Sequence, residues 1–92
     1  MGVLTVRVSD SGEAISKIRR FMQLYRRFTP QRYVVCQTSE GLVFVPLVSS
    51  RHSHTLNLVL NVDASEYEKL IDAIRKLGFE VVENCHYSPE PA

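Results

Sequence analysis

Four arginines whose spacing suits phosphate binding stand close together in the N-terminal half of the chain. They are Arg19, Arg20, Arg26 and Arg27. At the 100° per residue of an α-helix, the four side chains fall, together with Gln23, within one arc of about 120°. The guanidinium group carries a planar fork of donors that matches the geometry of phosphate oxygens. The pattern therefore predicts a phosphate-binding helix face, with nucleic acid as the partner.

The charge of the chain is divided by position, although the net charge of the whole is only +1. Residues 1–55 contain eight Lys/Arg and three Asp/Glu, whereas residues 56–92 contain three and seven. Arg32 and Arg51 would extend the arginine patch, and His52 and His54 stand beside Arg51 in a polar loop. We expect Arg51, His52 and His54 at the rim of the surface. The alternative is a solvated basic face, or one that pairs with acidic groups of a neighbouring copy.

No metal site, cofactor or catalytic group is predicted. His52, His54, Cys85 and His86 are candidate ligands by residue type. However, Cys85 and His86 are consecutive in an expected strand, so their side chains would point to opposite faces. No Gly-rich phosphate loop, nucleophile motif or paired carboxylates mark an enzyme. Enzyme activity therefore ranks below binding.

The two cysteines of the chain, Cys36 and Cys85, are 49 positions apart, without a partner at metal-finger spacing. In the cytosol of a mesophile both would be reduced, whereas in a hyperthermophile a Cys36–Cys85 disulfide is the alternative, which requires that their two strands be neighbours. Arginine outnumbers lysine eight to three and there are only two methionines. This composition favours a thermophilic source.

The elements that position these residues alternate between strands and helices. In chain order we expect strand 1–9, helix 10–28, strands 32–37, 42–48 and 55–62, helix 63–77 and strand 79–85. Capping-box pairs, Asp10 with Glu13 and Asp63 with Glu66, mark the two helix starts, and Pro30 stops the first helix. The apolar arc of the first helix is predicted to hold Ile15, Ile18, Phe21, Met22, Tyr25 and Phe28.

This order predicts an α/β (α+β) sandwich of ferredoxin-like plan, βαβββαβ, with a four- or five-stranded, mainly antiparallel sheet and two helices on one face. Residues 1–87 would form one domain and residues 88–92 a flexible tail. No apolar run approaches the roughly 20 residues that span a bilayer. The start resembles no signal peptide, so we expect a cytoplasmic protein without a membrane partner.

The third strand predicts self-association because it is apolar on both faces. With both helices on one side of the sheet, the other side would expose an apolar strip, which monomers usually avoid. We therefore expect a homodimer whose interface includes Val43, Phe44 and Val45. A curled sheet or the tail covering the strip is the competing explanation.

The best-supported function from sequence is a small nucleic-acid-binding domain. RNA is preferred over DNA by analogy, because small α/β sandwiches often accompany RNA-processing machinery. The alternative is a homodimeric interaction or regulatory module of unknown ligand with no nucleic-acid role. Such a module would tolerate glutamate at Arg19 and Arg27, but would dissociate when Phe44 or Val45 is replaced by a charged residue.

Overall fold

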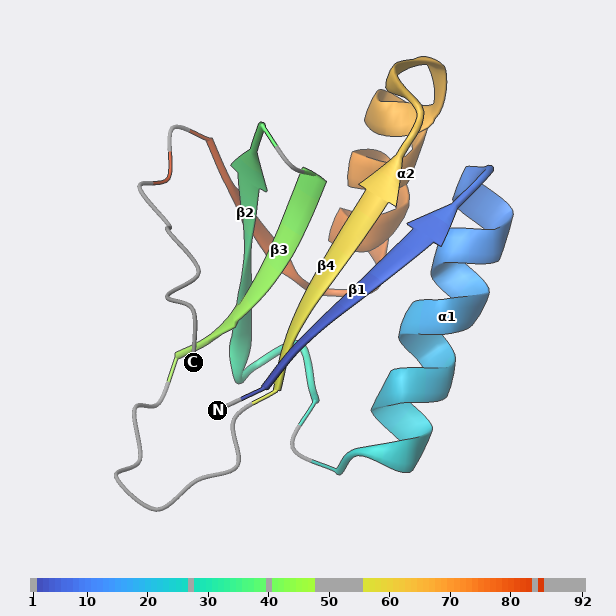
Figure 1. Cartoon of the computed structure of the whole chain (residues 1–92). Helices are drawn as coiled ribbons and strands as arrows, with labels where there is room; N and C mark the ends of the chain where they lie inside the picture. The colour runs from blue at the N-terminus through green and yellow to red at the C-terminus, as the bar shows by residue number, and fades with distance from the viewer. Residues whose placement is uncertain (1, 27, 40, 48–55, 84, 86–92) are drawn as a thin grey trace.

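The computed structural model describes residues 2–26, 28–39, 41–47, 56–83 and 85 (Figure 1). Strands and helices follow one another in the predicted order. They are β1 (Gly2–Val8), α1 (Ser11–Leu24), β2 (Tyr33–Thr38), β3 (Gly41–Pro46), β4 (Leu56–Val62), α2 (Ala64–Lys76) and β5 (Glu80–Val82). The predicted α+β class, with five strands and two helices in the described residues, is confirmed.

Three consecutive strands form the centre of the sheet, whose order is β1-β4-β3-β2-β5. The neighbours β2, β3 and β4 are antiparallel to one another. The edge strand β1 pairs parallel with β4, and the edge strand β5 pairs parallel with β2. Each of α1 and α2 makes the long connection that parallel strands require. The C-terminal ends of all strands except β3 therefore lie at the same end of the sheet, and both helices start at that end (Figure 1).

The predicted ferredoxin-like, mainly antiparallel arrangement is not confirmed, because the sheet is mixed and its strand order differs. In the observed order, β4 and β3 lie between β1 and β2, and β3 and β2 lie between β4 and β5. The cause is that β2, β3 and β4 stay together as neighbours, as consecutive strands usually do. Each helical connection must therefore cross two strands.

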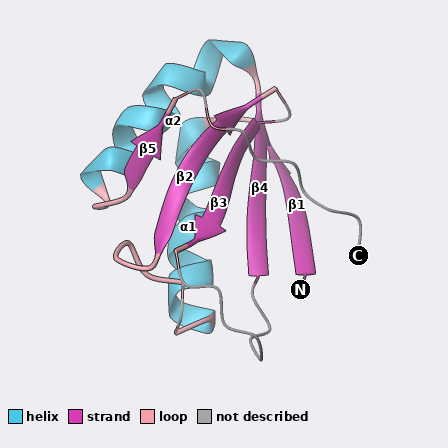
Figure 2. Ribbon diagram, turned by 90° about the vertical axis from the view of Figure 1, so that its left-hand side faces the viewer, coloured by secondary structure: helices cyan, strands magenta, loops and turns pink. Residues whose placement is uncertain are grey.

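Both helices lie on the same face of the sheet (Figure 2). Residue alternation along β3 directs Leu42 and Phe44 to that face and Val43 to the other. The main core between helices and sheet consists of Val8, Ala14, Ile18, Phe28, Tyr33, Val35, Leu42, Phe44, Leu58, Leu60, Leu70, Ile71, Ile74 and Phe79. We call the other side of the sheet the open face, because neither helix covers it.

The first helix ends four residues earlier than the apolar periodicity predicts. Its last residue is Leu24, and Tyr25 adopts an extended conformation with φ −116° and ψ 101°. This break lets Phe28 turn inward, where its ring lies 5.3 Å from that of Phe44, centroid to centroid. Phe28 is buried as the pattern implies, but from the segment after the helix. Arg26 consequently lies outside the helix.

Hydrogen bonds among three side chains fix the start of α1. The Asp10 carboxylate accepts from the Glu13 N–H at 2.7 Å. The Glu13 carboxylate in turn accepts from the N–H and the hydroxyl of Ser9, at 3.0 and 2.8 Å. The backbone hydrogen bond from Ser9 is the main reason why the pKa of Glu13 lies below its ordinary value of 4.5. At the start of α2, by contrast, Asp63 makes no side-chain capping bond.

Acid should weaken the fold partly through Glu13. A carboxyl group whose pKa is lower in the folded state stabilises the fold above its unfolded pKa, here 4.5. That stabilisation is lost as the pH falls through the folded-state pKa. We expect Glu13→Gln to flatten the dependence of the unfolding free energy on pH between about pH 5 and about pH 3, measured by urea denaturation. Glu68→Gln, at an exposed site on α2, is the control. An unchanged dependence in Glu13→Gln would contradict the prediction.

Candidate nucleic-acid interface

Basic side chains lie in the second half of α1, in the segment that links α1 to β2, and at the C-terminal end of α2. We call this set the basic end: Arg19, Arg20, Arg26, Arg32, Arg75 and Lys76. The two helices start at the same end of the sheet and run in the same direction (Figure 1). Directly after α2, Gly78 lies against Pro30, so that a Cβ there would be 3.4 Å from the Pro30 Cβ. This contact brings the C-terminal end of α2 to the loop that links α1 to β2.

Carboxylates gather at the opposite end of the molecule, which also carries the exposed Arg7 near the end of β1. Its carboxylates lie at or beside the N-termini of the two helices: Asp10, Glu13, Asp63, Glu66 and Glu68. The charge division along the sequence thus becomes an end-to-end division in space, but with different members. Arg75 and Lys76 come from the acidic half of the sequence and join the basic end. Glu80, at the start of β5, is an acidic residue at the basic end.

The predicted arginines share one end of the molecule, but they do not form one helix face. Arg19 and Arg20 are exposed on α1, whereas Arg26 is exposed in the segment after it. The predicted stacking of Arg26 two turns beyond Arg19 therefore does not occur. The other predicted members lie outside the described residues: Arg27, Arg51, His52 and His54.

The charge of the basic end is accessible. All of its side chains are exposed. In the part of the chain that the structure describes, no carboxylate forms an ion pair with any of them. Guanidinium groups remain protonated throughout the physiological pH range. These cations are consequently available to an anionic partner.

Exposed apolar side chains accompany these cations, and the sequence reasoning missed them. The exposed fractions are 64% for Leu24, 47% for Tyr25 and 57% for Leu47. The Leu47 N–H donates to the Arg32 carbonyl oxygen at 2.7 Å, which places Leu47 beside the basic end. The periodicity had assigned Tyr25 to the buried arc of α1. The sequence signal that could have identified Tyr25 as part of this surface is its position next to Arg26.

A groove of about 540 Å³ lies along α2 and shares Arg75 with the basic end. Its lining residues are Gln37, Tyr67, Glu68, Lys69, Ile71, Asp72, Arg75 and Glu83. Burial raises the pKa of the Tyr67 hydroxyl above its ordinary value. Carboxylates and cations alternate along this lining, so the groove offers no single charge that would select an anion or a cation. Sequence reasoning had assigned no function to this helix.

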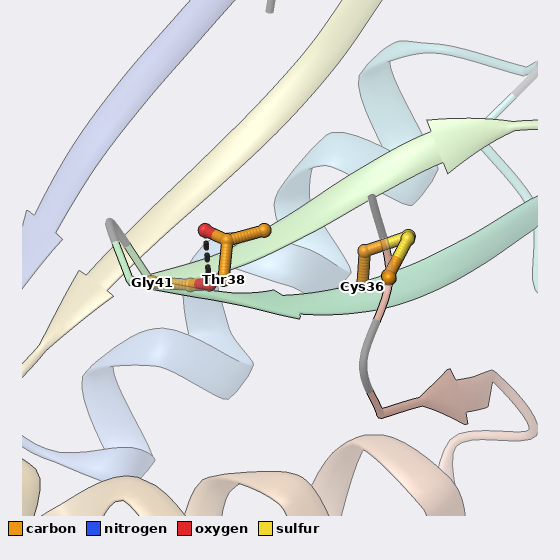
Figure 3. The surroundings of a disulfide bond; sticks show 4 residues. Cys36, Thr38 and Gly41 are labelled. Atoms are coloured by element: carbon orange, nitrogen blue, oxygen red, sulfur yellow. Dashed lines mark hydrogen bonds between the residues drawn. A yellow bond between two sulfur atoms is a disulfide. The ribbon is translucent and has the colours of Figure 1, made fainter. Parts of the chain in front are cut away.

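A disulfide between Cys36 and Cys85 crosses the open face of the sheet, with a Cα–Cα distance of 5.5 Å (Figure 3). Beneath it lies a small apolar cluster in which Cys36, Val43 and Val59 are only 4%, 1% and 4% exposed. Val34, Val45 and Cys85 pack against this cluster. We call Val34, Val43, Val45 and Val59 the valine strip.

Of the predicted dimer-interface residues, Val43 and Val45 lie on the open face. Phe44 does not, because it points to the helix side and is completely buried there. An interface formed through the open face would therefore not include the Phe44 ring.

Within the described ranges, no group of three or more His, Cys, Asp or Glu side chains is arranged to hold a metal ion. Neither α1 nor α2 is long and apolar enough to cross a membrane. No family model matches the chain, and neither does any curated protein or solved structure. The function is therefore inferred from the surfaces described above.

Reduction of the disulfide should destabilise the chain strongly. The bond closes a loop of 49 residues, which corresponds to about 4 kcal/mol of unfolding free energy in the loop-entropy model. Urea denaturation with and without a dithiol reductant measures this difference. The Cys36→Ser/Cys85→Ser variant is the control, since a reductant should not affect it. Coincident curves for the wild-type chain under both conditions would show that no disulfide forms.

Proposed function

We propose that the chain is a small nucleic-acid-binding domain, with RNA as the expected target, that contacts backbone phosphates through the basic end. The observation that carries this proposal is a set of exposed cations around the C-terminal parts of both helices that form no ion pair with any carboxylate of the described residues. The carboxylates near the helix N-termini lie at the other end and would repel a polyanion. Together the two ends select the orientation in which nucleic acid approaches.

Binding of this kind derives its free energy largely from counterion release. Each phosphate neutralised by an arginine or lysine displaces condensed cations, so affinity falls as salt rises. Contacts to phosphates carry no sequence information, so we expect tolerance of sequence. The choice of RNA follows from analogy with other small α+β domains that bind RNA.

Charge reversal at the basic end should weaken binding without affecting the fold. In Arg20→Glu/Arg26→Glu, two exposed cations become anions. We expect affinity for labelled RNA to fall at least about tenfold, and the slope of log K against log salt to decrease by about 1.4, which corresponds to two lost phosphate contacts on a single strand. Fluorescence anisotropy at low and near-physiological salt measures both quantities.

The matched control for this experiment is Lys17→Glu/Lys69→Glu, which makes the same change in charge at exposed sites outside the basic end. Its affinity should fall much less. Equal losses of affinity in the two variants would show that the effect arises from net charge alone. Absence of binding by the wild-type chain at low salt would refute the proposal.

A second candidate concerns the open face. We propose that the valine strip forms a homodimer interface in the reduced protein, with the chain acting as an interaction module. Val43 and Val59 are buried and Val34 and Val45 are half-buried while Cys85 packs against this cluster, so release of Cys85 would expose more of the strip to a second copy. In a reducing cytoplasm, the compartment we propose, the disulfide would be open. The homodimer would therefore form in the reduced state, whereas in the oxidised state Cys85 of the same chain would pack on the strip.

Dimerisation should therefore depend on reductant. Light scattering coupled to size exclusion should give a monomer for the oxidised chain and a dimer for the reduced one. Val45→Lys should prevent the reduced dimer, because it places an unpaired charge in the interface. Gln23→Lys, exposed on α1, should not. Monomers under both conditions would exclude this interface.

A further inference from the structure

Tyr25 is the exposed end of a series of aromatic contacts that begins in the core. Its ring stacks on Phe21 with a centroid distance of 5.8 Å and an interplanar angle of 20°. Phe21 contacts Phe28 at 6.0 Å, and Phe28 contacts Phe44 at 5.3 Å. Both Phe28 and Phe44 are fully buried, whereas Tyr25 is 47% exposed. The exposed ring is thus supported from beneath by rings that the core holds in place.

The backbone around Tyr25 is also fixed. Its N–H donates to the Phe21 carbonyl oxygen at 2.8 Å, and its carbonyl oxygen accepts from the Phe28 N–H at 2.8 Å. Both main-chain polar groups are therefore engaged within the protein. A ring held in this way loses little conformational freedom when a planar ligand stacks on it, which favours affinity.

The surroundings of Tyr25 define the chemistry of that ligand. Arg26 follows it directly and is exposed, and Arg20 is exposed on the last part of α1. Leu24 adds further exposed apolar surface. An aromatic ring among cations is the arrangement with which proteins bind single strands, since bases stack on the ring while the cations contact phosphates. A duplex buries its base faces within its own stack and cannot use such a ring.

We infer that the basic end binds single-stranded nucleic acid, with an unpaired base stacked on Tyr25 and the adjacent phosphates on the neighbouring arginines. This inference rests on the proposed function and specifies its substrate class. Tyr25 acts as the stacking platform and Arg26 as the phosphate contact beside it. Stacking uses only the face of a base, so single strands of RNA and DNA should both satisfy the site.

Four labelled probes of equal length test the inference by fluorescence anisotropy at low salt: single-stranded RNA, single-stranded DNA, duplex RNA and an abasic strand. The wild-type chain should bind both single strands about tenfold more tightly than the duplex or the abasic strand. Tyr25→Leu should lose this preference and keep the salt dependence, since its arginines are unchanged. Tyr25→Phe should retain the preference, because the ring remains. The chain contains no tryptophan, so quenching of tyrosine fluorescence gives a second readout.

The outcomes separate this inference from the proposed function. Equal affinity for all four probes, or a preference that survives in Tyr25→Leu, overturns the stacking role but leaves phosphate binding intact. Tight binding of the duplex alone also overturns it. Absence of binding to every probe at low salt overturns both proposals. The exposed Leu24 and Tyr25 would then be tested as part of a protein interface.

Discussion

The ring of Phe28 lies where the segment after α1 meets β2, β3 and the residue before β5. It is completely buried, with ring centroids 4.4 Å from Tyr33, 5.3 Å from Phe44 and 6.1 Å from Phe79. Tilted aromatic pairs of this kind contribute about 0.5–1.5 kcal/mol each beyond the burial of their surface. The chain must leave the helix before Phe28 for the ring to reach this position. The exposure of Tyr25 and the position of Arg26 outside the helix therefore follow from one packing requirement.

Much of the local structure could be predicted from the sequence, whereas the order of the strands could not. The order of the elements and the hydrogen bond from the Glu13 N–H to Asp10 follow from local patterns, whereas the predicted interface groups Phe44 with Val43, which lie on opposite faces of the sheet. No local sequence signal indicates which strands β1 and β5 pair with. A helix can cross one strand or two with the same periodicity and the same caps, and loop-closure entropy changes only slowly with length. Sheet order therefore depends on long-range packing that the pattern does not encode.

The candidate site was predictable in composition but not in shape. Arginine clustering identified Arg19, Arg20 and Arg26 because charge and spacing can be observed in the sequence itself. The error in shape has a specific cause: apolar residues continue at helical spacing through Tyr25 and Phe28, so periodicity extends the helix beyond its true end. Phe28 satisfies the pattern because it is buried, not because it is helical. In most helices the periodic apolar residues are both buried and helical, whereas Phe28 is buried but not helical.

Part of the charge distribution has a structural cause that is independent of function. Acidic residues in the first turns of both helices, and basic residues in the last turn of α2, complement the helix dipoles. This effect does not account for the arginines of α1. Its last turn contains no basic residue, Arg19 and Arg20 stand before that turn, and Arg26 and Arg32 are outside any helix. Clustered cations without carboxylate partners repel one another. The polyanionic partner that we propose would remove that repulsion, which no ion pair within the described part of the chain relieves.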